Sequence, residues 1–350
     1  MSDEAARASE VLLVGIGGIG CELAARCKGA ATRRFLDFDP NALARYDDSQ
    51  VISLVGDADD TDDMSPDSMR HTAADASERL ARAAEGHYDL VVLLGAVGGQ
   101  TGSLVLPVLA RELKNTSATT VVAAVEPLPF EGGARAEMAS HALTELEPAA
   151  DLLLTMPNRP LSDLCDAALP VSQAVECLKR KTIEAVSQLL AALTDGSCVG
   201  LQASELRRSL THAGRGAFGV GVARGPKRVE DALRDACAHS FLTQESCQLA
   251  TAAMLHLRGG TDLSLREVHS ATELITHLVG QVPVQAGLST TAANSDEVHA
   301  TLLVTGILPP KPTDTPLAAM GQHADLSIYE GVDLDVPAFL RRKASVHLTR

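Results

Sequence analysis

Two glycine-rich stretches decide the fold of this chain: Gly15-Ile16-Gly17-Gly18-Ile19-Gly20 and Gly98-Gly99-Gln100-Thr101-Gly102-Ser103. Each follows an apolar run typical of a buried strand, VLLV over 11–14 and LVVLL over 90–94, and each precedes a helical pattern. A glycine-rich turn between a strand and a helix directs backbone N–H groups toward an anion. Neither stretch ends in Gly-Lys-Ser/Thr, so a P-loop is excluded. The pair therefore predicts two backbone loops that close on one polyphosphate without a phosphate-binding lysine.

The spacing of the apolar runs predicts an α/β fold with a doubly wound parallel sheet. Six short β-branched or leucine-rich runs alternate with alanine-rich helical patterns between residues 11 and 160. A long central helix begins near Pro170, and a second, α+β domain of mixed strands and helices follows. The predicted parts are a flexible N-terminus (1–10), a nucleotide-binding domain (11–169), the central helix (170–195), the α+β domain (196–308), a proline-containing linker (309–332) and a tail peptide (333–350).

Composition and charge exclude several classes of protein. The net charge of −15 argues against a nucleic-acid partner, because phosphate backbones are bound by surfaces rich in lysine and arginine. No apolar run reaches the ~18 residues that a transmembrane helix needs, and the N-terminus does not resemble a secretory signal. Seven cysteines without a C-x-x-C pair favour reduced thiols. The prediction is a cytoplasmic protein without a transmembrane segment.

Taken alone, the first glycine stretch also fits a Rossmann enzyme. Gly15, Gly17 and Gly20 match G-x-G-x-x-G after a strand, and Asp39 follows a second strand about 20 residues on, where an acid binds a ribose hydroxyl. An NAD-dependent or adenylating enzyme is therefore an alternative. The second stretch argues against it, because a Rossmann enzyme does not require such a loop, and the sequence offers no catalytic histidine, metal-ligand cluster or nucleophile set.

Several motifs in the right order resemble the FtsZ and tubulin superfamily, and they cover about residues 11–342. The second glycine stretch resembles the signature G-G-G-T-G-[ST] and departs from it only at Gln100. Phe130-Glu131-Gly132 followed by Arg135 resembles the loop F-x-F-E-G-x-x-R, and Met156-Pro157-Asn158 resembles the I-P-N turn. The chain is therefore similar to a divergent bacterial member of this superfamily.

The resemblance continues beyond the first domain. Residues 259–268, GGTDLSLREV, are close to the family's G-G-x-D-L-x-L-x-E-V. Residues 334–342, LDVPAFLRR, resemble the tail peptide that docks on membrane tethers of the FtsA and ZipA type. The resemblance implies a tether that binds Asp335–Arg342 and recruits the chain to the inner face of the membrane. It also implies head-to-tail self-association in cell division or membrane remodelling, with FtsZ itself as a further candidate partner.

The resemblance implies that the cofactor is GTP or GDP, with Mg²⁺ as a further candidate. In the family the Glu and Arg of the third motif contact the ribose, and an acid at the start of the central helix reads guanine; alignment places that acid near Glu176. Glu22 stands where the family often has asparagine, another acceptor that could meet guanine. The candidate cofactor-binding residues are Gly17, Gly18, Gly20, Cys21, Asp39, Gly98, Gly99, Gln100, Thr101, Gly102, Ser103, Glu131, Arg135, Asn158 and Glu176.

Two departures from the family's pattern concern hydrolysis. Residues 56–63, GDADDTDD, stand where the family has a glycine-rich loop that senses the γ-phosphate, and their five carboxylates would repel a triphosphate. In the family, the loop N-x-D-F-A-D-V supplies two acids that position water in the neighbouring subunit's site. Gln202 replaces the first acid and Glu205 keeps the second. A positioned base contributes about 100- to 10,000-fold to rate, so GTP hydrolysis is predicted to be slow or impaired.

A non-hydrolysing, non-polymerising scaffold or regulator with the same fold is therefore a second alternative. It would keep the fold and the tail peptide and modulate an active FtsZ.

Overall fold

The computed structural model describes residues 10–54, 66–84, 87–116, 118–156, 170–194, 208–238, 241–280, 282–290 and 296–307. These residues belong to one compact unit that spans residues 1–308. Asn158, Gln202, Glu205, the acidic stretch 56–63 and the predicted tail lie outside the described residues. The predicted domain boundaries at 169, 195 and 308 also fall outside them and stay predictions.

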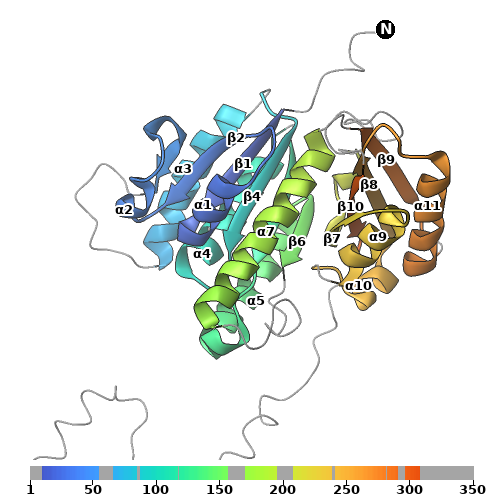
Figure 1. Cartoon of the computed structure of the whole chain (residues 1–350). Coiled ribbons are helices and arrows are strands. Elements are labelled where there is room, and N and C mark those ends of the chain that lie inside the picture. Colours follow the sequence, from blue (N-terminus) through green and yellow to red (C-terminus); the bar gives the residue numbers. More distant parts are fainter. Residues whose placement is uncertain are drawn as a thin grey trace, which may run out of the picture. The chain divides into compact units, whose positions relative to one another are not determined.

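Six parallel strands form the first part of a single ten-stranded sheet (Figure 1). Their order is β3-β2-β1-β4-β5-β6, so the direction of winding reverses between β1 and β4. This confirms the predicted doubly wound sheet, and ligands of such sheets bind at the carboxyl ends of the strands beside that reversal. The strands are β1 (Val11–Ile16), β2 (Thr32–Asp37), β3 (Val51–Ser53), β4 (Leu90–Ala96), β5 (Thr119–Val125) and β6 (Leu152–Met156).

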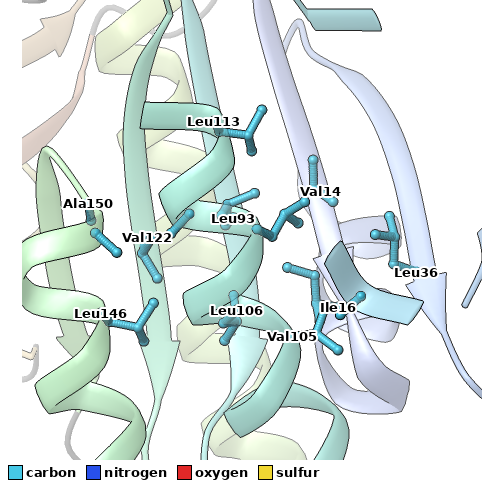
Figure 2. Close-up of a cluster of buried hydrophobic side chains, with 14 of the residues drawn as sticks. Val14, Ile16, Leu36, Leu93, Val105, Leu106, Leu113, Val122, Leu146 and Ala150 are labelled. Carbon is cyan, nitrogen blue, oxygen red and sulfur yellow. The ribbon is translucent and has the colours of Figure 1, made fainter. Parts of the chain in front are cut away.

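Helices cover both faces of these strands because successive strand residues point to opposite faces. Leu13 of β1 packs in one cluster with residues of α1 and α7, whereas Val14 packs in another with residues of α3, α4 and α5. Figure 2 shows part of the second cluster, which includes Leu106 of α4, Leu146 of α5 and Val122 of β5. The helices are α1 (Gly17–Arg26), α2 (Pro40–Leu43), α3 (Pro66–Ala84), α4 (Gln100–Lys114), α5 (Gly133–Ala149) and α7 (Val171–Thr194).

The remaining four strands continue the same sheet. β7 pairs with β6 in parallel, with Leu152 opposite Gly214 and Leu154 opposite Gly216, and its other edge pairs with β10 in antiparallel register. The mixed order of strands and helices agrees with the predicted α+β composition of this part. They are β7 (Gly214–Arg224), α9 (Arg228–Ala238), α10 (Gln244–Leu249), β8 (Ala252–Gly259), α11 (Leu265–Val279), β9 (Val284–Thr290) and β10 (Glu297–Thr305).

The stretch 259–268 has a structural role in this second part. The buried Arg228 at the start of α9 donates hydrogen bonds to Asp262 Oδ2 at 2.9 Å and to Glu267 Oε1 at 3.0 Å. Glu267 also accepts a hydrogen bond from the Ser264 N–H at 2.8 Å and so closes a capping box at the start of α11. Asp262 and Glu267 therefore connect α11 and the loop before it to α9 through their hydrogen bonds with Arg228.

The helices of the described ranges include none with the length and apolar character needed to cross a bilayer.

Candidate functional site

A cavity of about 450 Å³ lies at the carboxyl ends of β1, β4 and β5, and residues of α1, α4 and α7 line it. Its position matches the point where the winding of the sheet reverses, and its volume is within the range of small-molecule sites. The two glycine stretches and the Phe130–Arg135 segment all contribute to its wall.

The two glycine stretches meet in this cavity. Gly17 has a φ of +71°, a conformation that side-chain-bearing residues rarely adopt. A Cβ placed on Gly17 would lie only 3.5 Å from Thr101 Cβ, which belongs to the second stretch. Of the predicted phosphate-binding residues, those that line the cavity are Gly17, Gly18, Gly99, Gln100, Thr101 and Gly102.

Two helices begin at this junction without a side-chain cap. Ile16 precedes α1 and Gly99 precedes α4, and neither provides a side-chain hydrogen bond to the first turn. The first N–H groups of a helix have no acceptor within the helix, and the helix dipole adds partial positive charge there. The arrangement can therefore hold an anion through backbone groups from both loops at once.

Three glycines of the stretches allow close packing of the backbone. A Cβ on Gly20 would lie 2.4 Å from the carbonyl oxygen of Leu94, and one on Gly102 would lie 1.9 Å from that of Ala96. Gly98 has a φ of +93° and lies against the backbone of Arg135. Gly20 and Gly98 do not line the cavity, although Gly102 does. These glycines bring α1 and α4 close enough to β4 for their first turns to reach one site.

The Phe130–Arg135 segment forms another wall. Glu131 Oε1 accepts a hydrogen bond from the Leu128 N–H at 2.8 Å, and Glu131 Oε2 accepts one from Arg135 Nη1. Both side chains line the cavity, and so does Phe130, which is 61% exposed. The predicted ribose-binding pair is therefore held together at the cavity by a turn that the glutamate itself closes.

Three further predicted residues, Cys21, Asp39 and Ser103, do not line the cavity. Cys21 is buried, its thiol donates to the Gly15 carbonyl at 3.2 Å, and burial raises its pKa to about 12. Asp39 caps α2 by accepting a hydrogen bond from the Asn41 N–H at 2.8 Å. Ser103 Oγ accepts one from the Gly98 N–H at the same distance. The interactions of all three stabilise the loops around the site.

Glu176 does not line the cavity either. Its carboxylate accepts a hydrogen bond from Arg26 Nη2 at 2.6 Å, and this contact lowers its pKa. The cavity face of α7 consists instead of Val175, Leu178, Lys179 and Thr182. Lys179 was not predicted from the sequence, although helical periodicity from Val175 could have found it, since residues four apart share a face.

Two acids near the site were also missed. Glu126, which follows β5, lines the cavity, and burial raises its pKa. Asp37 ends β2 and is buried, its Oδ1 accepts a hydrogen bond from the Phe38 N–H at 2.8 Å, and burial raises its pKa. A Cβ on Gly18 would lie 3.9 Å from Asp37 Oδ2. The signal for both is an acid at the carboxyl end of an apolar run.

The cationic side chains that line the cavity are already paired with acids, so backbone N–H groups are the main candidates for binding an anion. Arg135 and Lys179 are the cations among the described residues that line the cavity, and they form ion pairs with Glu131 and Glu22. The described ranges contain no group of three or more histidine, cysteine or acidic side chains arranged to hold a metal ion. The predicted Mg²⁺ therefore stays a prediction.

Solved structures with this fold include members of two groups. An empty FtsZ dimer from M. jannaschii is 24% identical, with a TM-score of 0.75, and the match covers 87% of this chain and 90% of that one. A GTPγS-bound protofilament of CetZ2 from Haloferax volcanii is 20% identical, with a TM-score of 0.70, and the match covers 86% of this chain and 94% of that one.

Two family models match consecutive parts of the chain. The model of the Tubulin/FtsZ family GTPase domain matches residues 10–166, which include both glycine stretches. The model of the FtsZ family C-terminal domain matches residues 214–308. Together the two models span most of the sequence and agree with the fold, so this chain belongs to the Tubulin/FtsZ family.

Proposed function

We propose that this chain binds a guanine nucleotide in the cavity and self-associates head to tail as a cytoskeletal protein. The observation that carries the proposal is the meeting of two uncapped helix N-termini, those of α1 and α4, at one cavity. Two such termini supply converging backbone donors for a chain of phosphates, and neither needs a lysine.

The other walls suit the remainder of a nucleoside. Glu131 offers carboxylate acceptors and Arg135 offers guanidinium donors at the cavity, which suit ribose hydroxyls. Phe130 provides an exposed ring beside them. GTP or GDP would be held by these groups together with the amides of Gly17, Gly18 and residues 99–102.

Self-association is supported by the solved relatives and by the rim of the cavity. The similar structures include an FtsZ dimer and a CetZ2 protofilament. Ile19 and Phe130 line the cavity and are 46% and 61% exposed, so a subunit that covers the cavity would bury apolar surface. A contact between two different surfaces of the same chain produces a filament when the rotation between successive subunits does not close into a ring.

Hydrolysis in this filament is proposed to be slow. Gln202, where the family has its first acid, cannot accept a proton from water, which leaves Glu205 as the one carboxylate of the pair. The same replacement supports a second candidate function, a non-hydrolysing scaffold that modulates an active FtsZ. Under either function, Asp335–Arg342 would bind a membrane adaptor of the FtsA or ZipA type and recruit the cytoplasmic protein to the membrane.

Identification of the nucleotide released by denaturing the purified protein, read with sedimentation in GTP and in GDP, tests the proposal. GTP or GDP in the supernatant and GTP-dependent pelleting are expected. NAD or an adenine nucleotide would overturn the guanine assignment and support a Rossmann enzyme. Guanine nucleotide without pelleting would favour the scaffold.

The rate of GTP hydrolysis at a polymerising concentration tests the proposed chemistry. The wild-type rate is expected to be low, Glu205→Ala is expected to abolish it, and Gln202→Asp is expected to increase it. A wild-type rate that Gln202→Asp leaves unchanged would contradict the role given to this position.

A further inference from the structure

Gln100 is the first residue of α4 and lines the cavity, as do Gly17 and Gly18 of the facing glycine stretch. Its side chain is exposed, and its carboxamide forms no hydrogen bond with the part of the chain that the structure describes. A glutamine carboxamide carries two N–H donors and one carbonyl acceptor. Where the family signature has glycine, this chain therefore places a side chain with unused hydrogen-bond donors beside the anion site.

Helix geometry directs this side chain toward the anion site. The Cα–Cβ bonds of an α-helix tilt toward its N-terminus, so a long side chain at the first position projects beyond the first turn. The neighbouring space is open, because a Cβ placed on Gly99 would meet no atom within 4 Å outside its two chain neighbours. The carboxamide of Gln100 therefore reaches farther from α4 than the backbone N–H groups do.

The backbone donors of α4 that an anion can use lie close to the start of the helix. The Ser103 N–H already donates to the Gly99 carbonyl at 3.0 Å. The N–H groups of residues 100–102 are the ones left without an acceptor in the helix, and they hold an anion directly at its N-terminus. A phosphate that lies farther from the helix needs a donor on a side chain.

Among the described residues, the wall offers no unpaired cation to such a phosphate. Arg135 and Lys179 are the cations of this part of the wall, and both form ion pairs with acids. Glu126 adds an acid to the same wall. The acidic stretch 56–63, which stands where the family has its γ-phosphate loop, is predicted to repel a triphosphate. A neutral hydrogen-bond donor is the kind of group that the described wall still supplies, and Gln100 carries one.

We propose that the Gln100 carboxamide binds the terminal phosphate and makes the site selective for a nucleoside triphosphate over a diphosphate. This inference rests on the proposed nucleotide binding and names the residue that selects the phosphate length. The N–H groups of Gly17, Gly18 and residues 100–102 hold the two phosphates nearest the nucleoside. The third phosphate extends beyond these amides, and Gln100 Nε2 donates to its oxygens.

The size of the selectivity follows from one hydrogen bond to a charged group. At an exposed position water replaces part of this bond, which leaves a change on the order of tenfold in the dissociation constant. GDP gains nothing from Gln100, because its terminal phosphate is already held by the backbone amides. The wild type is therefore expected to bind a triphosphate on the order of tenfold more tightly than GDP.

Competition against a fluorescent GDP derivative measures the dissociation constants of GDP and of the β,γ-imido analogue of GTP, which is not hydrolysed during the titration. Gln100→Ala should weaken binding of the analogue on the order of tenfold and change that of GDP by less than about twofold. Gln100→Glu has nearly the same shape and should weaken the analogue further, because a carboxylate repels the phosphate. Gln100→Asn, which keeps the carboxamide on a shorter side chain, should recover part of the affinity that Gln100→Ala loses.

Gln244 provides a matched control. It is the first residue of α10, as Gln100 is of α4, and it does not line the cavity. Gln244→Ala and Gln244→Glu should leave both dissociation constants within about twofold of the wild type. Thermal unfolding of each variant without added nucleotide shows whether the fold is kept, and if one Gln100 variant does not fold, the other two carry the test.

The outcomes distinguish this inference from the proposed function. If the wild type binds neither guanine nucleotide, the proposed function fails and this inference fails with it. If the wild type binds the two nucleotides equally tightly, or if Gln100→Ala weakens both by the same factor or neither, the proposed function stands and the role of Gln100 is refuted. A loss confined to the triphosphate analogue supports the role, because a merely structural effect of the substitution would weaken GDP as well.

Discussion

Gly102 and Gly99 provide a direct test of the packing that forms the site. Both glycines belong to the second stretch and line the cavity. A Cβ on Gly102 would lie 1.9 Å from the carbonyl oxygen of Ala96, whereas a Cβ on Gly99 would have no atom within 4 Å. The obstacle at Gly102 is backbone, so no side chain can rotate away from it. Gly102→Ala should therefore destabilise the fold much more than Gly99→Ala.

The size of the effect follows from two opposing contributions. Overpacking costs about 1–3 kcal/mol, and the upper value applies because α4 must move from β4. Alanine gains up to about 1 kcal/mol over glycine in a helix, which leaves a net loss of about 2 kcal/mol. At about 2–4 °C per kcal/mol, the unfolding midpoint should fall by about 4–8 °C. Gly99 precedes α4, where alanine costs about 0.5 kcal/mol and 1–2 °C.

Circular dichroism melting of the wild type and both variants, in identical buffer without nucleotide, measures this difference. Leaving out nucleotide removes any contribution of ligand binding to the midpoint. The reasoning is refuted if Gly102→Ala melts within about 1 °C of Gly99→Ala, since such a result would mean that α4 and β4 are not in close contact.

Three further predictions concern titratable groups whose pKa values are shifted by burial. Burial lowers the pKa of His256 to about 4. As the pH falls below 6.5, the imidazole is therefore protonated in the unfolded chain before it is protonated in the folded chain. This difference should remove about 3 kcal/mol of stability by pH 4. Urea unfolding should show that the free energy of unfolding falls less between pH 7 and pH 4 in His256→Gln than in the wild type. An equal fall in both proteins would contradict this. Burial raises the pKa of Glu126, so its ionised carboxylate destabilises the fold at pH values above that pKa. Below pH 4.5 the carboxyl is protonated in both the folded and the unfolded chain, and this cost is absent. Glu126→Gln should therefore raise the melting temperature at pH 7 by a few degrees, with the gain disappearing in acid; a lower melting temperature at pH 7 would refute this. Burial raises the pKa of the Cys21 thiol to about 12, so the thiol should react with iodoacetamide at pH 8 at least about 100-fold more slowly in the native protein than after unfolding. Mass spectrometry of the labelled site measures both rates. Rapid labelling of the native protein would show that the thiol is accessible and would refute the prediction.

Local sequence patterns were sufficient to predict the sheet and the place of the site. A buried parallel strand is a continuous apolar run, and a glycine-rich turn after it opens a helix; both signals are local. These two signals predicted β1 and β4, the starts of α1 and α4, and the convergence of the two glycine stretches on one site. β9 was missed because its residues, Val284–Thr290, include glycine and polar side chains and form no continuous apolar run.

The role of a residue could not be predicted where it depends on which distant part of the chain the residue contacts in the fold. Gly20 was assigned to phosphate binding but does not line the cavity, and a glycine needed for close packing looks the same in the sequence. Alignment placed the base-reading acid at Glu176, whereas the rotation of α7 that turns Lys179 to the cavity follows from packing against the sheet. Glu22 and Arg26 pair with each other within α1, but each also has a partner on α7 about 150 residues away, beyond any local pattern.

The pairing of β6 with β7 limits how this protein can change shape. Backbone hydrogen bonds run without a break from β3 to β9, so no flexible joint crosses the sheet. Opening the molecule between its two halves would require breaking the pairs from Leu152–Gly214 to Leu154–Gly216. Motions that accompany ligand exchange are therefore expected to be sliding or tilting of helices over an intact ladder of strands.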